Sequence, residues 1–305
     1  MTGLPLALEL QGPIEAALAR LREGSGAQCL SDHAFSNLYL FREAHDYRYL
    51  PGDWPCISGR TYDGTRHLMP LFALDSAPHD LLRRLLDGHG CFYPVAQRDA
   101  QGLPPEAFDL SDSPDDADYL YAARQFVDYP GRTLAHKRSQ MRQLLATRTL
   151  SAEPFGEAGA ADAHAVLRGW MAQKGKTAGE ADEAPCIEAI AQAGRFGLEG
   201  FVHLADNAPV VFVLAQELQP GVFVMRFAKG LDSHAGIYPY MFQHFCRSLG
   251  RPVEWLNFEQ DMGLPGFRRS KRSYGPAALI PKLRVRPVCG APLSQFAQDR
   301  DGSAA

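Results

Sequence analysis

The sequence predicts a mixed αβ protein of two domains, and three observations lead to this prediction. The chain has 305 residues, which is about twice the length of a typical domain. Helical and strand-like apolar patterns alternate in both halves. Residues 199–259 contain two short apolar runs around a turn, then a third run, a helix and a fourth run. We expect domains at residues 1–150 and 151–285, and a flexible tail at 286–305.

The first half begins with an amphipathic helix at 13–24, because Ile14, Leu18 and Leu21 fall on one face and Gly24 follows. The next segments alternate between the two patterns. Helices are predicted at 34–43 and 78–88, and strands at 46–50, 55–59, 67–74 and 91–95. Residues 101–118 are rich in glycine, proline and acidic side chains, so we expect a surface connection there.

The second half turns from helices to strands. Residues 119–146 hold the start of a strand, a turn at Pro130-Gly131 and a basic helix. Two apolar runs from residue 199 onward are separated by Asp206-Asn207, which predicts a β-hairpin. Helices are also predicted at 160–173, 185–196 and 234–249, and strands at 221–230 and 253–259. This order matches the C-terminal part of an N-acetyltransferase-like (GNAT-like) domain.

Composition limits the classes of function. The formal net charge is −4, so contact with nucleic acid would need a local basic patch. The six cysteines include no CxxC pair, which indicates reduced thiols of a cytoplasmic protein. The histidines show no ligand spacing, and we expect no metal site. The N-terminus lacks the basic start of a signal peptide, and no apolar run is long enough for a transmembrane helix.

The densest motif is NFEQDMGLPGFRRSKRSY at residues 257–274. It follows the pattern N-x-E-x-D-x-G-x-x-G-x-R-x-x-K-x-S-Y and resembles a large bacterial family related to the C-terminal domain of phosphatidylglycerol lysyltransferases. The stretches YLYAARQFVDYPGRTLAHKRSQMRQLLA (119–146) and FAKGLDSHAGIYPYMFQHF (227–245) resemble two further motifs of that family. With SDHAFSNLYLFR near the start, the resemblance covers most of residues 30–282.

The resemblance implies two tandem GNAT-like domains and, as in characterised relatives, transfer of an aminoacyl group from a charged tRNA to an amine or a lipid hydroxyl. A small-molecule, peptide or lipid acceptor is compatible with this activity. The membrane-embedded half of the lipid-modifying relatives is absent from these residues, which weighs against a lipid acceptor. The oligomeric state is left open by the sequence.

The motif contains the candidate catalytic residues. Glu259 and Asp261 alternate near a strand end, so their side chains leave on the same face. Glu259 is a candidate general base, with an ion-pair role as the alternative, whereas Asp261 fits a structural ion pair better. Lys271 is expected to meet donor phosphate or carbonyl oxygen, and Tyr274 to hold the reacting ester or to pack. Asn257 and Arg268 complete the substrate-binding residues predicted in this motif.

The crossover at 228–236 lies where a coenzyme A enzyme would bind pyrophosphate. It lacks the paired glycines that such a loop needs, and the Asp232 carboxylate would repel phosphates. We predict that Lys229 and Asp232 line the edge of the site and that no coenzyme A is used, with simple helix capping as the alternative.

Two basic segments are candidates for contact with tRNA phosphates, with solvated faces as the alternative. The first, on the basic helix and the turn before it, includes the predicted contacts Arg132, Lys137 and Arg138. The second carries seven positive charges and no acid between residues 268 and 286.

Three functions remain open at this point. The leading hypothesis is an aminoacyl-tRNA-dependent transferase that works by direct transfer, since no nucleophile-elbow motif is present. The second is an acyl-coenzyme A-dependent N-acyltransferase of GNAT type. The third is a non-catalytic binding protein that retains the fold.

Overall fold

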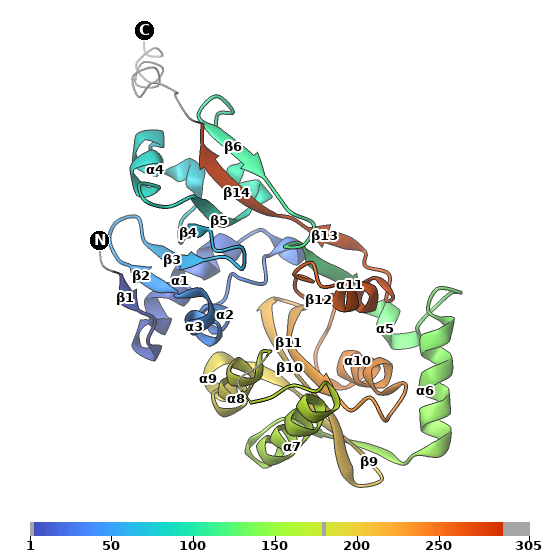
Figure 1. Cartoon of the computed structure of the whole chain (residues 1–305). Coiled ribbons are helices and arrows are strands. Elements are labelled where there is room, and N and C mark those ends of the chain that lie inside the picture. Colours follow the sequence, from blue (N-terminus) through green and yellow to red (C-terminus); the bar gives the residue numbers. More distant parts are fainter. Residues whose placement is uncertain (1–2, 179–180, 289–305) are drawn as a thin grey trace. The chain divides into compact units, whose positions relative to one another are not determined.

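The computed structural model describes residues 3–178 and 181–288. They form two compact units (Figure 1). Unit 1 comprises the chain up to Ala17, Arg42–Ser113 and the chain from Pro281. Unit 2 comprises Leu18–Phe41 and Pro114–Ile280. Each unit contains a seven-stranded mixed sheet, so the prediction of a mixed αβ protein with two tandem GNAT-like domains is confirmed.

The sheet of unit 1 has the strand order β1-β2-β3-β4-β5-β14-β6. Its strands are β1 (Leu4–Pro5), β2 (Arg48–Leu50), β3 (Cys56–Arg60), β4 (Arg66–Pro70), β5 (Cys91–Ala96), β6 (Phe108–Ser111) and β14 (Lys282–Pro287). Only β4 and β5 pair in parallel, and α4 (His79–Leu85) connects them. The apolar side of α4 packs on this sheet through Leu82, beside Phe92 and Val285.

The sheet of unit 2 has the order β8-β9-β10-β11-β12-β7-β13. Its strands are β7 (Asp118–Ala122), β8 (Leu150–Pro154), β9 (Leu198–Ala205), β10 (Ala208–Gln219), β11 (Val222–Gly230), β12 (Trp255–Asn257) and β13 (Ala278–Ile280). The turn between β9 and β10 is the predicted hairpin, with Asp206 and Asn207 both at positive φ. Again one pair is parallel, β11 with β12, and α10 (Ile237–Ser248) connects the two strands.

The two sheets therefore repeat one pattern that the sequence does not reveal. In each, five strands follow in chain order, the fourth and fifth are parallel and joined by a helix, and two antiparallel strands complete the edge. The sixth position is filled by β14 in unit 1 and by β7 in unit 2. β14 follows the expected boundary at residue 150, although the other strands of its sheet precede it, and β7 precedes the boundary, although the rest of its sheet follows it. The two units therefore do not follow that boundary.

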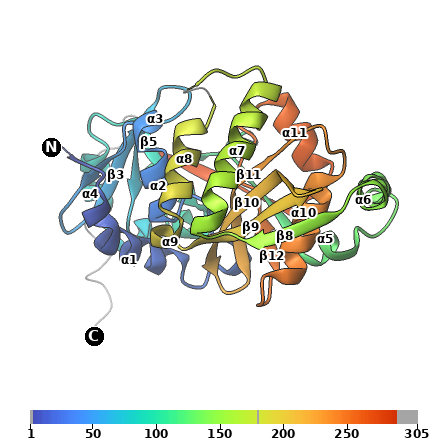
Figure 2. The same cartoon turned by 90° about the horizontal axis from the view of Figure 1, so that it is seen from below.

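Helices cover both faces of the unit 2 sheet (Figure 2). On one face lies α7 (Glu157–Gln173), where Gly159 approaches Val202. On the other face lies α10, whose Phe245 contacts Phe201 and Phe223. Next to α10 lie α5 (Arg124–Asp128) and α6 (Ala135–Thr147). The other helices longer than one turn are α1 (Gln11–Arg22), α2 (Phe35–Leu40), α8 (Glu183–Ala191) and α11 (Pro265–Arg272), with short α3 (Arg42–His45) and α9 (Ala193–Phe196).

Three segments differ from the expected elements. The connection expected at 101–118 contains β6, and residues 265–272, for which the sequence predicted no helix, form α11. The tail expected at 286–305 begins inside β14, and residues 289–305 lie outside the described part of the chain. Within residues 3–178 and 181–288, no helix combines the length and the apolar character that crossing a membrane requires.

Candidate functional site

The candidate site lies where β11 and β12 separate. Val222–Val224 pair in parallel with Trp255–Asn257, and there β12 ends. The rest of β11, up to Gly230, pairs with β10 alone. In mixed sheets, ligands bind where the carboxyl ends of neighbouring strands part, so residues just beyond Val224 and Asn257 are placed to meet a substrate.

A β-bulge in β11 lies directly beside this point. Leu214 pairs with Phe227 and Gln216 with Val224, so two residues of β11 oppose one residue of β10. The two are Met225 and Arg226. Met225 joins the hydrophobic cluster around α10, whereas Arg226 points to the other face. Arg226 thus shares the face of Val222 and Val224, and bulges are frequent beside active sites.

Arg226 forms an ion pair with Glu259 across the point of separation. Their Nη1 and Oε1 atoms lie 2.6 Å apart, and the side chains are 1% and 20% exposed. The second terminal nitrogen of Arg226 donates to the backbone oxygen of Ser31 at 2.8 Å and to Oε1 of Gln216 at 3.3 Å. The Nε atom of Arg226 is buried and has no hydrogen-bond partner among the described residues.

Glu259 is held by a chain of buried polar groups. Its backbone N–H donates to Oδ1 of Asn257 at 2.7 Å, and Nδ2 of Asn257 donates to Asp118 at 3.1 Å. Asp118 also accepts hydrogen bonds from the backbone N–H and the hydroxyl of Ser31. Glu259 itself has φ of 58°, a conformation that is costly for a residue with a side chain and recurs at functional sites.

The electrostatics of Glu259 fit a group that exchanges protons. Burial raises the pKa of Glu259 above its usual range, and the nearby Asp118 carboxylate adds to the effect. The charges of Arg226 and Lys271 partly oppose this rise. A carboxylate whose pKa is perturbed by burial next to a specific charge partner is a candidate for acid–base chemistry.

Lys271 acts on the backbone around Glu259. Its Nζ atom lies 2.5, 3.1 and 2.6 Å from the backbone oxygens of Phe258, Glu259 and Gln260. These three contacts match the three donors of an ammonium group. The predicted contact with donor phosphate is therefore not the role that this geometry favours, because the group fixes the strand end that carries Glu259.

Asp261 and Arg268 form the structural pair that the sequence suggested for Asp261. Asp261 is fully buried and accepts hydrogen bonds from the Tyr119 hydroxyl, from Gly263 N and from Arg268. The bonds from Arg268 are the largest cause of a lowered pKa of Asp261. Arg268 also pairs with Asp115 at 2.5 Å. The predicted substrate contact of Arg268 thus coincides with two internal ion pairs.

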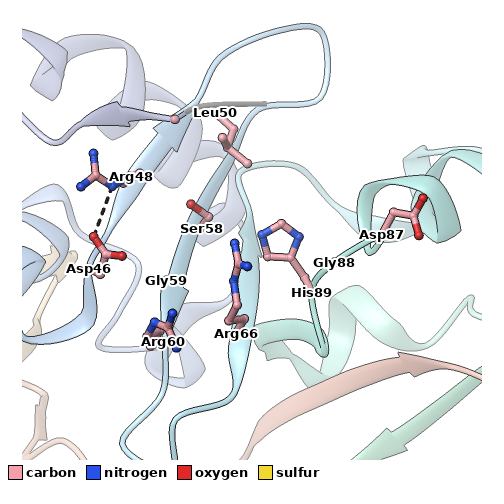
Figure 3. A pocket seen from close by; sticks show the side chains of 11 residues that line it. Asp46, Arg48, Leu50, Ser58, Gly59, Arg60, Arg66, Asp87, Gly88 and His89 are labelled. Carbon is pink, nitrogen blue, oxygen red and sulfur yellow. Dashed lines mark hydrogen bonds and ion pairs between the residues drawn. The ribbon is translucent and has the colours of Figure 1, made fainter.

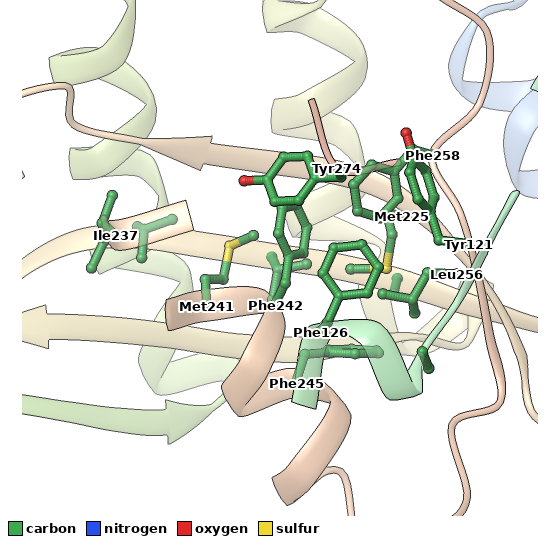
Figure 4. Close-up of a cluster of buried hydrophobic side chains, with 14 of the residues drawn as sticks. Tyr121, Phe126, Met225, Ile237, Met241, Phe242, Phe245, Leu256, Phe258 and Tyr274 are labelled. Atoms are coloured by element: carbon green, nitrogen blue, oxygen red, sulfur yellow. The ribbon is translucent and has the colours of Figure 1, made fainter. Parts of the chain in front are cut away.

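Tyr274 lies in an aromatic cluster with Phe126, Phe242 and Phe258 (Figure 4). Its side chain is buried, and burial raises its pKa. The hydroxyl forms no hydrogen bond with the described residues, and in Figure 4 it is directed to the side of the cluster where Ile237 begins α10. The hydroxyl oxygen is not among the buried polar atoms that lack a partner, so it reaches solvent and a ligand can contact it.

The basic helix α6 meets this cluster through one of its predicted residues. Nζ of Lys137 lies 4.2 Å from the centre of the Tyr274 ring, and burial lowers the pKa of Lys137. Arg138 instead donates to the backbone oxygens of Tyr129 and Gly131 and so fixes the turn before the helix. Arg132 is exposed. Of these three residues, Lys137 is the one that contacts Tyr274.

Lys229 and Asp232 lie at the end of β11 and beyond it, with partners from α7 and the segment that leads into α8. Nζ of Lys229 lies 2.7 and 2.8 Å from the carboxylate oxygens of Asp182 and 4.1 Å from the centre of the Trp170 ring. Asp232 pairs with Lys174 at 2.6 Å. Both predicted residues are thus engaged on the α7 side of the sheet.

Sequence reasoning missed Arg226, Ser31 and Asp118. A usable signal existed for Arg226, since it is the first charged residue in the otherwise apolar run from Val222. A charge at the centre of such a strand is costly unless it is paired. Ser31 and Asp118 gave no comparable signal, because their contact spans 87 positions in the chain.

The comparisons with known proteins give the family and the fold of the chain. Residues 27–286 match the family described as phosphatidylglycerol lysyltransferase, C-terminal. A comparison with curated proteins gives no match. Among solved structures, the chain is similar to a conserved protein of unknown function from Bacteroides thetaiotaomicron, with a TM-score of 0.76 and 19% identity over 94% of this chain and 99% of that one.

Two further structures share the fold. One is L-PGS from Bacillus licheniformis, with a TM-score of 0.60 and 14% identity over 94% of this chain and 93% of that one. The other is the C-terminal domain of a putative lysylphosphatidylglycerol synthetase from Agrobacterium fabrum, with a TM-score of 0.60 and 12% identity over 92% of both chains. The chain therefore belongs to the phosphatidylglycerol lysyltransferase C-terminal family, a family of acyl- and aminoacyltransferases.

Proposed function

We propose that this protein transfers an aminoacyl group from a charged tRNA directly to an amine or hydroxyl acceptor. The observation that carries the proposal is the Arg226–Glu259 pair at the point where β11 and β12 separate. It supplies a carboxylate with a raised pKa, held by buried groups beside a strand opening. The family match, which includes this motif, supports the same activity.

The proposed reaction needs three actions from the protein. Glu259 accepts the proton of the acceptor nitrogen or oxygen as that atom attacks the ester carbonyl. The Tyr274 hydroxyl donates a hydrogen bond to the oxyanion that develops on the carbonyl oxygen. The bond from the carbonyl carbon to the ribose oxygen then breaks, and the proton passes from Glu259 to that oxygen. Arg226 keeps Glu259 ionised between turnovers, and Lys271 positions its backbone.

The start of α10 weighs against the alternative donor, acyl-coenzyme A. A pyrophosphate site there needs free backbone N–H groups at the helix N-terminus, and Pro239, in the first turn, has none. A Cβ atom on Gly236 would lie 2.5 Å from the backbone oxygen of Gln140, so α6 packs tightly against this terminus.

A transfer assay tests the proposal. The full chain is incubated with a pool of tRNAs that carry labelled amino acids, together with a cell extract that supplies acceptors. We expect a labelled product that is neither free amino acid nor aminoacyl-tRNA, and we expect none with Glu259→Gln. Labelled product from acetyl-coenzyme A instead would support the GNAT-type alternative. No product from either donor, with intact tRNA binding, would support a non-catalytic binding protein.

A further inference from the structure

Unit 1 contains a cavity of about 360 Å³ that the transfer reaction does not use. It lies between β2, β3, the start of β4 and the turn that follows α4 (Figure 3). Cavities of this size hold small molecules. Since β4 and β5 are parallel, the cavity is at their amino ends, whereas the ligand position of a GNAT-like sheet is at the carboxyl ends. The cavity is therefore separate from that ligand position.

Two arginines on neighbouring antiparallel strands lie opposite each other at this cavity. Arg60 and Arg66 are directly paired in the register of β3 and β4, and both line the cavity. Like charges in opposed positions of an antiparallel pair destabilise the sheet. Among the described residues, no carboxylate forms an ion pair with either guanidinium. The arrangement is therefore one that a bound anion would stabilise.

Other groups around the two arginines suit an anion. Arg48, on the neighbouring strand, is already paired with Asp46 at 3.2 Å. Figure 3 shows Arg66 between Ser58 and His89, with the Asp87 carboxylate directed away from them. Nδ1 of His89 is buried and has no hydrogen-bond partner among the described residues. Burial lowers the pKa of His89, and the charge of Arg66 adds to this.

We propose that this cavity binds the phosphate group of a small-molecule ligand, with Arg60 and Arg66 as the clamp. Guanidinium groups bind phosphate oxygens in pairs of parallel hydrogen bonds, and the Ser58 hydroxyl and the His89 ring are positioned to complete the set. The phosphate belongs to inorganic phosphate or to a phosphomonoester such as a nucleotide. A concave site of this volume favours either over a nucleic-acid strand, which needs an open groove.

The test measures the melting temperature and the dissociation constant of the full chain with inorganic phosphate, adenosine 5′-monophosphate, adenosine and a short single-stranded RNA. We expect phosphate or the monophosphate, and not adenosine, to raise the melting temperature. Arg60→Gln and Arg66→Gln should weaken this binding by at least about 10-fold. Arg84→Gln, which removes an exposed arginine of α4 outside the cavity, should leave it unchanged.

Two further measurements keep the test decisive. Without ligand, Arg66→Gln should melt at or slightly above the temperature of the unmodified protein, since it removes the repulsion from Arg60. If a glutamine variant fails to fold, Arg60→Lys keeps the charge but loses the paired hydrogen bonds, and should bind phosphate more weakly. The proposal is overturned if no phosphate compound binds, if the arginine variants bind like Arg84→Gln, or if the RNA alone binds.

Discussion

Arg226 and Glu259 lie 2.6 Å apart at the point where β11 and β12 separate. The pair links a bulge in one strand to a strained residue just beyond the other. The stability of the core does not explain this arrangement, because a buried ion pair costs desolvation and adds little net stability. The general-base role that we propose for Glu259 would account for the buried pair and for the strained backbone at Glu259.

Replacing Arg226 with methionine should destabilise the protein by about 3 kcal/mol at pH 8, because it leaves the Glu259 carboxylate buried without its cation. The deficit should depend on pH. When the pKa of a carboxyl is higher in the folded than in the unfolded protein, its protonation favours folding at pH values below the unfolded pKa. This contribution to stability is lost as pH rises through the folded pKa. The deficit should therefore shrink as Glu259 becomes protonated on the way to pH 4.5.

Urea unfolding of the Arg226→Met variant between pH 4.5 and pH 8 measures this dependence. Arg226→Lys is the matched control, since it keeps the charge and should lose much less stability. A deficit that is equal at all pH values would show that Arg226 contributes by packing and not through the charge of Glu259.

Removal of the Tyr274 hydroxyl separates its two possible roles. Because the ring packs in the aromatic cluster and the hydroxyl has no partner among the described residues, Tyr274→Phe should change the melting temperature by less than about 2 °C. If the hydroxyl stabilises the oxyanion, turnover should fall by about 10- to 1,000-fold. Steady-state kinetics and thermal unfolding of the variant distinguish the two roles. Unchanged turnover would show that Tyr274 only packs in the cluster.

Contact with tRNA should depend on exposed arginines, not on the internally paired ones. Arg142 on α6 and Arg269 on α11 are exposed, whereas Arg268 pairs with Asp261 and Asp115. Arg142→Glu with Arg269→Glu should weaken tRNA binding and lower its salt dependence. Filter binding at 50 and 200 mM salt measures both. Arg84→Glu, in unit 1, serves as the control, and equal losses in both proteins would point to net charge alone.

The sequence predicted the strands and helices that local pattern controls. The hairpin around Asp206 and the helix between β11 and β12 follow from turn chemistry and apolar periodicity. The exchange of β7 and β14 between the two sheets could not be predicted, because strand pairing over such distances leaves no local pattern. The two strands β7 and β14 were therefore assigned to the wrong sheets.

The site was predicted in part for a similar reason. Glu259 and Tyr274 share one motif, so the resemblance to a known family pointed to both. The partner of Glu259 comes from another strand, 33 positions away in the chain, and no local pattern shows that the two residues are paired. The second basic segment also divides between the units, with Arg268 and Lys271 in unit 2 and Arg284 in unit 1. A linear run of charge does not establish one patch.

Glu259 is the proposed general base, and the Glu259→Gln variant tests this role. Turnover is measured per folded molecule, well below the melting temperature, because the variant also weakens the pair with Arg226. We expect turnover to fall by about 100-fold or more. We also expect the unmodified protein to lose activity as pH falls through a pKa above the usual glutamate range, and the variant not to. Normal turnover per folded molecule in a variant that only melts earlier would contradict the role as general base and make Glu259 a structural partner of Arg226.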